Sequence, residues 1–192
     1  MNIQTNFSLK NYNTFGIEAK AKQFVSVSSI DELKEVLTEN DDIFILGGGS
    51  NMLLTQDIQK LVVHVNLKGK EVIEKNEDFA IVKAQAGENW HEFVLYCIEQ
   101  NLGGIENLSL IPGNVGTTPI QNIGAYGVEI KDTMLSCEAL NLKTLELETF
   151  TNEDCQFEYR ESIFKKELKN QYIITSVSFK LSTKNHKIYT TY

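Results

Sequence analysis

Residues 111–127 read IPGNVGTTPIQNIGAYG and contain no charged side chain, although 23% of the 192 residues are charged. The segment holds both prolines, Pro112 and Pro119, and the wider stretch 103–127 holds six of the twelve glycines. A long loop inside a compact domain is usually functional or disordered, and the apolar side chains of Ile111 and Ile123 favour an ordered loop. Small residues, hydroxyls and side-chain amides around accessible backbone are typical of a surface that surrounds a large, flat ligand. A purely structural Gly/Pro loop is the alternative.

A second glycine-rich segment, GGGSN at residues 47–51, follows the apolar run 43–46. Consecutive glycines let main-chain N–H groups point into one concavity and let a ligand approach closely, so we interpret this segment as a phosphate-binding loop. A simple glycine-rich turn is the alternative. The dinucleotide fingerprint of Rossmann domains is excluded because Met52 stands where its third glycine would be, and a P-loop is excluded because no Lys-Ser/Thr pair follows.

Composition limits the classes of protein to consider. Lysine and arginine number 18 against 26 acidic residues, a net charge of −8, which argues against a nucleic-acid partner. No apolar run is long enough to cross a membrane, and the N-terminus lacks the pattern of a signal peptide, so we expect a cytoplasmic location. The cysteines form no CxxC pair, so neither a disulfide framework nor a metal site is expected; they are Cys97, Cys137 and Cys155.

The remaining sequence predicts a mixed α+β fold. Ser29 and Glu32 form a capping box before a helix that ends near Asn40, and this helix joins strands at 23–27 and 43–46 in a β-α-β unit. A second helix is expected from about Glu88 to Gln100, with an apolar stripe formed by Trp90, Phe93, Val94, Cys97 and Ile98.

Further strands are expected at 60–67, 71–75 and 80–84, and residues 134–140 and 144–150 are expected to form a hairpin. In the last strand, 172–181, one face is predicted to carry Ile173, Thr175, Val177, Phe179 and Leu181. A boundary between two subdomains is expected near residues 55–61.

Arg160 is the only arginine, whereas lysine occurs seventeen times. Arginine offers a planar, permanently charged, bidentate donor that lysine cannot replace, so we interpret Arg160 as a functional residue. An ordinary ion-paired surface arginine is the alternative, because Glu158 and Glu161 flank it.

Three motifs in order, GGGSN at 47–51, the Pro112–Gly127 segment and Tyr159-Arg160-x-Ser162-x-Phe164-Lys165, closely resemble the UDP-N-acetylenolpyruvoylglucosamine reductase family. The resemblance runs from about residue 13 to the C-terminus. It implies an FAD-binding fold of the vanillyl-alcohol-oxidase (PCMH) type with two α/β subdomains. Residues 1–57 would form the smaller subdomain with the pyrophosphate loop, residues 58–184 the larger one, and residues 185–192 the start of a link to a C-terminal substrate domain that this chain lacks.

The resemblance also implies roles for individual residues. Arg160 would be catalytic, stabilising the charge that develops on the enolpyruvyl group, while Tyr159 and Ser162 would position its turn. Tyr126 and Tyr192 would contact the substrate. The cofactor would be bound by Gly47, Gly48, Gly49, Ser50, Asn51, Pro112, Gly113, Gly116, Thr117, Thr118, Gln121, Asn122, Gly124, Ala125 and Gly127.

The implied reaction is the reduction of UDP-N-acetylglucosamine enolpyruvate to UDP-N-acetylmuramate in peptidoglycan synthesis, with NADPH as reductant. FAD is expected to be non-covalent, because no histidine or cysteine lies in either loop. The intact protein would be a monomer without nucleic-acid or membrane partners, and this chain alone would bind FAD but catalyse poorly. The alternatives are a non-catalytic flavin-binding module and another oxidase of the same fold.

Overall fold

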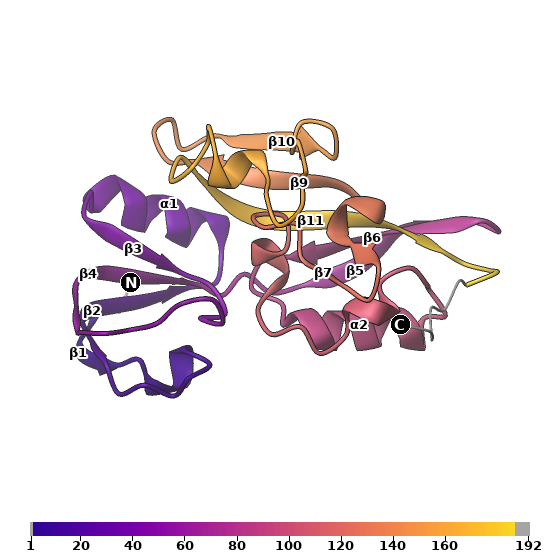
Figure 1. The fold of residues 1–192 in the computed structure, drawn as a ribbon. Helices are drawn as coiled ribbons and strands as arrows, with labels where there is room; N and C mark the ends of the chain where they lie inside the picture. Colours follow the sequence, from indigo (N-terminus) through magenta and orange to yellow (C-terminus); the bar gives the residue numbers. More distant parts are fainter. Residues whose placement is uncertain (1, 187–192) are drawn as a thin grey trace.

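The computed structural model describes residues 2–186 and contains two larger sheets that lie side by side (Figure 1), together with a two-stranded sheet of β7 and β8. The first sheet has the strand order β1-β2-β4-β3 and the second the order β10-β9-β11-β6-β5. The helices and strands of the whole structure are β1 (Gln4–Ser8), β2 (Lys20–Val27), α1 (Ile30–Glu39), β3 (Ile43–Leu46), β4 (Ile58–Val65), β5 (Lys70–Lys75), β6 (Phe79–Gln85), α2 (Trp90–Glu99), β7 (Gly124–Ala125), β8 (Val128–Glu129), β9 (Met134–Asn141), β10 (Leu147–Thr151) and β11 (Tyr172–Ser182). Short 3-10 turns lie at Lys10–Tyr12, Glu106–Leu108, Val115–Thr117, Ile130–Asp132 and Ile163–Lys165.

The first sheet is built around β4, which pairs in parallel with both β2 and β3. A subdomain boundary at residues 57/58 would cut this sheet, so the expected division was misplaced: Ile58–Val65 belongs with β1, β2 and β3. Parallel pairing joins strands that are distant in the sequence, and the local pattern of β4 does not reveal its partner.

Both faces of the first sheet are covered. Val25 and Val27 of β2 pack with Leu33 and Val36 of α1, as the apolar stripe of this helix predicts. On the opposite face, Phe24 packs with Leu9 and Leu46, and Tyr12 and Met52 pack against this cluster. Strand β1 was not expected, because its residues are mostly polar and exposed.

The second sheet carries α2 on one face. Trp90 and Phe93 of the helix contact Phe179 of β11, with ring centroids 5.8 and 5.1 Å from it. The Trp90 indole N–H donates to the carbonyl of Leu108 at 2.7 Å, so the helix is also tied to the chain that leads into the glycine- and proline-rich segment. Ile98, which was expected in the apolar stripe, is 45% exposed.

A bulge in β11 changes which residues share a face. The pairing with β9 shifts between Ile174 and Ser176, so Ile174, Val177, Phe179 and Leu181 face the core under α2. Ile173 instead packs in the cluster that contains α1 and Val65. The simple alternation predicted for this strand was therefore wrong at its start, and the displaced Ile173 helps to join the two sheets.

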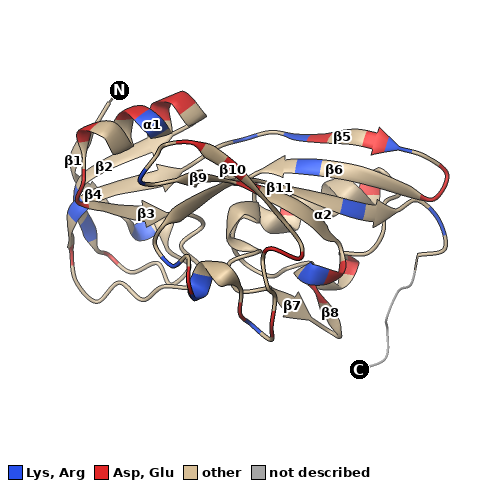
Figure 2. Cartoon of the chain, turned by 90° about the horizontal axis from the view of Figure 1, so that it is seen from above, with Lys and Arg blue, Asp and Glu red and all other residues tan. Residues whose placement is uncertain are grey.

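Charged residues of both signs are interspersed along α1 and β5 (Figure 2). Among residues 2–186, no helix is long and apolar enough to cross a bilayer.

Candidate functional site

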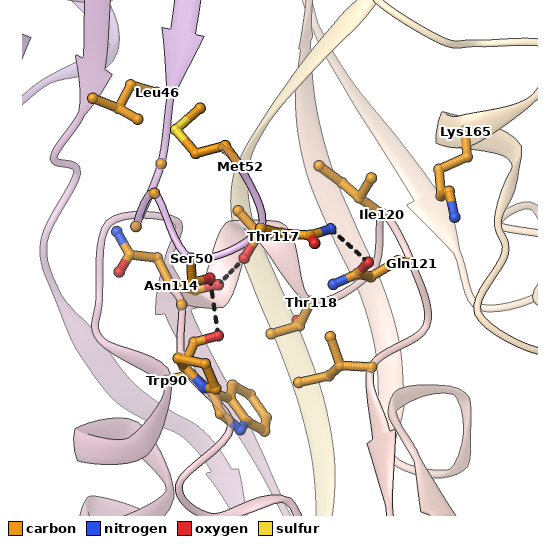
Figure 3. Close-up of a pocket in the computed structure, with 17 residues that line it drawn as sticks. Leu46, Ser50, Met52, Trp90, Asn114, Thr117, Thr118, Ile120, Gln121 and Lys165 are labelled. Carbon is orange, nitrogen blue, oxygen red and sulfur yellow. Dashed lines mark hydrogen bonds between the residues drawn. The ribbon is translucent and has the colours of Figure 1, made fainter. Parts of the chain in front are cut away.

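A pocket of about 260 Å³ lies where the 47–51 segment meets the 111–127 segment (Figure 3). Glycines, hydroxyls and amides from both segments form its wall. The predicted site residues that line it are Gly47, Gly48, Gly49, Ser50, Asn51, Pro112, Gly113, Thr117, Thr118 and Gln121. The structure thus brings together two segments that are more than sixty residues apart in the chain.

Two side-chain hydrogen bonds join these segments. The Ser50 hydroxyl donates to the carbonyl of Pro112 at 3.1 Å, and the Asn51 amide donates to the side-chain oxygen of Gln121 at 3.0 Å. Figure 3 shows both bonds beside the pocket. They fix the separation of the two segments and therefore the width of the space between them.

Main-chain N–H groups are the main donors that this pocket offers. Within residues 2–186, the N–H groups of Gly48, Gly49, Ser50 and Asn51 have no acceptor in the protein. Unpaired backbone donors need another partner, and several of them on one turn make a concavity that suits an anion. The residues present therefore fit the pyrophosphate of a dinucleotide without a cationic side chain in this turn.

The glycines of the first segment have a second role, which the sequence did not reveal. A Cβ on Gly48 would lie 2.9 Å from the Asn114 side-chain oxygen and 3.0 Å from Gly113 Cα, and a Cβ on Gly49 would lie 2.0 Å from the Tyr12 carbonyl oxygen. These glycines are required by the packing of the chain against itself, whether or not a ligand is bound. The same holds for Gly116, whose Cβ would lie 2.4 Å from that of Ala86.

The structure corrects the expected role of Asn122. Its side chain is fully buried and does not line the pocket: the amide group donates to the carbonyl of Glu158 at 2.9 Å, and the amide oxygen accepts from the N–H of Lys131 at 3.2 Å. The side chain of Asn122 therefore holds protein segments together and does not line the pocket. Other predicted site residues that do not line this pocket are Gly116, Gly124, Ala125, Tyr126, Gly127 and Arg160.

Arg160 lies in a tight turn with a backbone φ of +56°, and its guanidinium donates to the carbonyl of Gly124 at 2.6 Å. Its acidic neighbours are paired elsewhere, Glu158 with Lys166 and Glu161 with Lys165. Among the described residues, Arg160 therefore forms no ion pair, and the alternative of an ion-paired surface arginine finds no support.

Tyr126 lies at the tip of a small hairpin, between β7 and β8, which the sequence analysis did not predict. Tyr126 and Gly127 both have positive φ values, as a tight two-residue hairpin turn requires. The Tyr126 side chain is 60% exposed, so it is accessible for a contact with another molecule. Tyr192, the second predicted substrate contact, lies outside the described residues.

Residues that were not predicted also line the pocket: Leu46, Met52, Trp90, Asn114, Ile120, Ile123 and Lys165. A neighbouring cavity of about 730 Å³ shares Gly47, Thr117, Ile120 and Lys165 with it. The first pocket alone is too small for a dinucleotide, and the shared wall gives an elongated ligand a path along both cavities. Lys165 belongs to the Tyr-Arg-x-Ser-x-Phe-Lys motif, and this was the signal that could have identified it.

The chain is 66% identical over 194 residues to a protein from Flavobacterium johnsoniae named UDP-N-acetylenolpyruvoylglucosamine reductase, and 48% identical over 185 residues to the Neisseria gonorrhoeae protein of the same name. These matches cover 100% and 94% of this chain but 58% and 54% of the relatives. The chain therefore spans slightly more than half the length of the relatives it matches.

Solved structures agree on the fold. UDP-N-acetylenolpyruvylglucosamine reductase from Thermus caldophilus superposes with a TM-score of 0.73 at 24% identity, covering 97% of this chain and 63% of that protein. A solvent-stable cholesterol oxidase superposes with a TM-score of 0.61 at 15% identity, covering 94% and 37%. The predicted α+β fold of the vanillyl-alcohol-oxidase type is confirmed. Because the profile of the FAD binding domain matches residues 21–146, more than half of the chain, the chain belongs to the FAD-binding domain family.

Proposed function

We propose that this chain is the FAD-binding part of an NADPH-dependent reductase that converts UDP-N-acetylglucosamine enolpyruvate to UDP-N-acetylmuramate. The names of the relatives at 66% and 48% identity support the substrate and the reaction. The proposed enzyme acts in the cytoplasm as a monomer, and its product serves peptidoglycan synthesis, hence cell shape and division.

The observation that carries the proposal is the turn of unpaired N–H groups at residues 48–51, which faces the 111–127 segment across the pocket. In the proposal this turn binds the FAD pyrophosphate. Hydrogen bonds from N–H groups to a charged phosphate contribute about 1.5–3 kcal/mol each. In this protein of net charge −8, the turn supplies such donors without a cationic side chain of its own.

The second segment offers groups of complementary kinds. Thr117 and Thr118 donate their hydroxyl hydrogens to backbone carbonyls at 2.7 and 2.8 Å, so their oxygens remain as acceptors for ligand hydroxyl or N–H groups. Gln121 accepts from Asn51 through its oxygen, which leaves its NH₂ group to donate. When bound, FAD supplies hydride transfer between a nicotinamide nucleotide and the double bond of an acceptor.

Arg160 is proposed to stabilise negative charge on the carboxylate side of the enolpyruvyl group. Its guanidinium is free of ion pairs among the described residues, and its bond to the Gly124 carbonyl orients it beside the cofactor-binding segment. Donors held in place before the reaction stabilise developing charge most effectively, and removal of one commonly lowers kcat by about 10²–10³-fold.

The first test is the visible spectrum of the purified protein. We expect a bound flavin spectrum, release of free FAD by acid, and rebinding on titration. A properly folded protein that stays colourless in excess FAD would refute the proposal.

The second test separates the half-reactions in the protein at the length of its relatives. Arg160→Ala should leave reduction of the flavin by NADPH nearly unchanged and lower its reoxidation by the enolpyruvyl substrate about 10²–10³-fold, with Arg160→Lys as a control that retains charge but loses the planar fork. Equal loss in both half-reactions contradicts the role of Arg160. Rapid reoxidation by oxygen with no response to the nucleotide sugar would identify an oxidase instead.

A further inference from the structure

The turn that carries Arg160 is a closed loop with a narrow base. The N–H of Ile163 donates to the carbonyl of Cys155 at 2.9 Å, and Glu158 and Glu161 exchange backbone hydrogen bonds of 3.1 and 3.2 Å. Tyr159 and Arg160 form the tip. The location of the guanidinium therefore depends on how the base of this loop is attached to the rest of the protein.

Two buried side chains attach that base to the 111–127 segment. The Asn122 amide donates to the carbonyl of Glu158 at 2.9 Å, and the Ser162 hydroxyl donates to the carbonyl of Ile120 at 2.7 Å. Asn122 and Ser162 are both completely inaccessible to solvent. One bond is donated by the 111–127 segment and the other by the loop. Their loop residues, Glu158 and Ser162, lie on either side of Arg160 in the sequence.

Asn122 suits this location for two physical reasons. Its backbone φ is +41°, a region that asparagine tolerates better than most residues. Its side chain carries a donor and an acceptor, and both are used, toward Glu158 and from Lys131. Without the Asn122 donor, the Glu158 carbonyl keeps only its bond from the N–H of Glu161, and the link from this carbonyl to the 111–127 segment is lost.

We propose that Asn122 is a positioning residue for Arg160: its buried amide holds the Glu158 carbonyl and so fixes the Arg160 turn against the cofactor-binding segment. Asn122 acts through Glu158 and does not touch the cofactor or the substrate. The inference rests on the proposed function for the role of Arg160, whereas the attachment of the turn is independent of that role.

The single arginine gives a direct test of attachment. An arginine-specific protease cuts the 192-residue chain only after Arg160, and the new N-terminus at Glu161 identifies the cut by mass spectrometry. Asn122→Asp keeps the shape and the acceptor but removes the donor. We expect the cut to form about tenfold faster in this variant, the factor expected when one buried hydrogen bond is lost.

The matched control is Asn152→Asp. Asn152 donates to the carbonyls of Lys131 and Met134 at 2.8 and 2.7 Å, and it contacts neither the Arg160 turn nor the pocket. This variant should lose stability without faster cutting after Arg160. If both variants are cut equally fast, or if Asn122→Asp is cut at the wild-type rate, the positioning role is overturned.

A pH profile adds a signature that a general loss of stability does not give. As the pH falls, the introduced carboxyl becomes protonated and can donate to the Glu158 carbonyl in place of the lost amide. The excess cutting of Asn122→Asp should therefore disappear toward acid pH, measured relative to wild type at each pH. Excess cutting that persists in acid contradicts the proposal.

The half-reactions then distinguish this inference from the proposed function. At the length of the relatives, Asn122→Asp should retain FAD and its reduction by NADPH, and reoxidation by substrate should slow about tenfold or more. Suppose that Asn122→Asp is cut faster but is reoxidised by substrate at the normal rate. If Arg160→Ala is also reoxidised normally, the catalytic role of Arg160 is refuted, whereas the attachment of the turn by Asn122 stands. If instead Arg160→Ala is reoxidised slowly while Asn122→Asp is reoxidised normally, the positioning role of Asn122 is refuted.

Discussion

Replacement of Gly49 by alanine should disrupt the first segment of the site far more than the same replacement at Gly16. The two glycines have nearly the same backbone φ, +62° at Gly49 and +63° at Gly16. Alanine in this left-handed region costs about 1–2 kcal/mol, and both variants bear that cost. They differ in their surroundings, because a Cβ on Gly16 meets nothing within 4 Å, whereas a Cβ on Gly49 would lie 2.0 Å from the Tyr12 carbonyl oxygen.

The clash at Gly49 involves backbone on both sides, so no side-chain rotation relieves it. The Tyr12 carbonyl carbon and Asn13 Cα also lie within 3.0 Å of the added atom. Forcing packed segments apart costs about 1–3 kcal/mol. Added to the conformational cost, this gives a loss of about 2–5 kcal/mol in the free energy of unfolding for Gly49→Ala, against about 1–2 kcal/mol for Gly16→Ala.

The movement should also reach the ligand site. When the 47–51 segment withdraws from Tyr12, it loses the bond from the Thr14 N–H to the Gly49 carbonyl, now 3.1 Å, and the N–H groups of residues 48–51 change direction. Urea unfolding gives the stability of both variants, and titration with FAD followed by flavin fluorescence gives the affinity. Equal stability of the two variants within about 0.5 kcal/mol, or unchanged FAD affinity of Gly49→Ala, would refute this reasoning.

Three further predictions concern single side chains. Ser50→Ala removes the bond to the Pro112 carbonyl and should weaken FAD binding roughly three- to tenfold by titration, with little change in unfolding; unchanged affinity would show that this bond does not set the pocket. The pKa of Glu138 is lowered by hydrogen bonds from Lys83 and a serine, so its stabilisation is present above the usual glutamate pKa and lost as the pH falls through the lowered value. Glu138→Gln should therefore lower the free energy of unfolding at pH 7 by less than about 1 kcal/mol, since the pair is partly exposed, and should match wild type near pH 3; a difference that persists in acid contradicts this. All three cysteines are buried, and burial raises the pKa of the Cys97 thiol to about 12, so a thiol reagent should label the protein only after unfolding; rapid labelling of the native protein would contradict it.

Local sequence patterns predicted most helices and strands of this fold. The Ser29 hydroxyl accepts from the Glu32 N–H at 3.1 Å and begins α1, and the hairpin of β9 and β10 forms with antiparallel pairing as expected. The failures were non-local. Strand β4 shows no sign in its own sequence of pairing with β2 and β3, and the bulge in β11 depends on its register with β9.

The two segments of the site were predicted as ligand-binding loops from composition alone, but composition does not identify what fills the space beside a glycine. At Gly48 and Gly49 that space holds Asn114 and Tyr12, so the absence of side chains serves packing within the protein. The N–H groups of residues 48–51 have no acceptor among residues 2–186, so they need another hydrogen-bond partner. The same residues therefore serve internal packing and offer N–H donors to a ligand, and the number of glycines in the sequence does not distinguish these two roles.

Asn122 shows why the order of a motif does not give the direction of its side chains. It follows Gln121, which lines the pocket, yet its φ of +41° turns its side chain into the protein, toward a carbonyl 36 residues farther along the chain. The 111–127 segment thus has two faces, one toward the pocket and one toward the Arg160 turn. Gly124 extends the second face, since its carbonyl accepts from the guanidinium itself. A substitution on the pocket face is therefore expected to alter cofactor affinity. A substitution on the face toward the Arg160 turn is expected to alter hydride transfer to the acceptor, so mutation can separate the two effects.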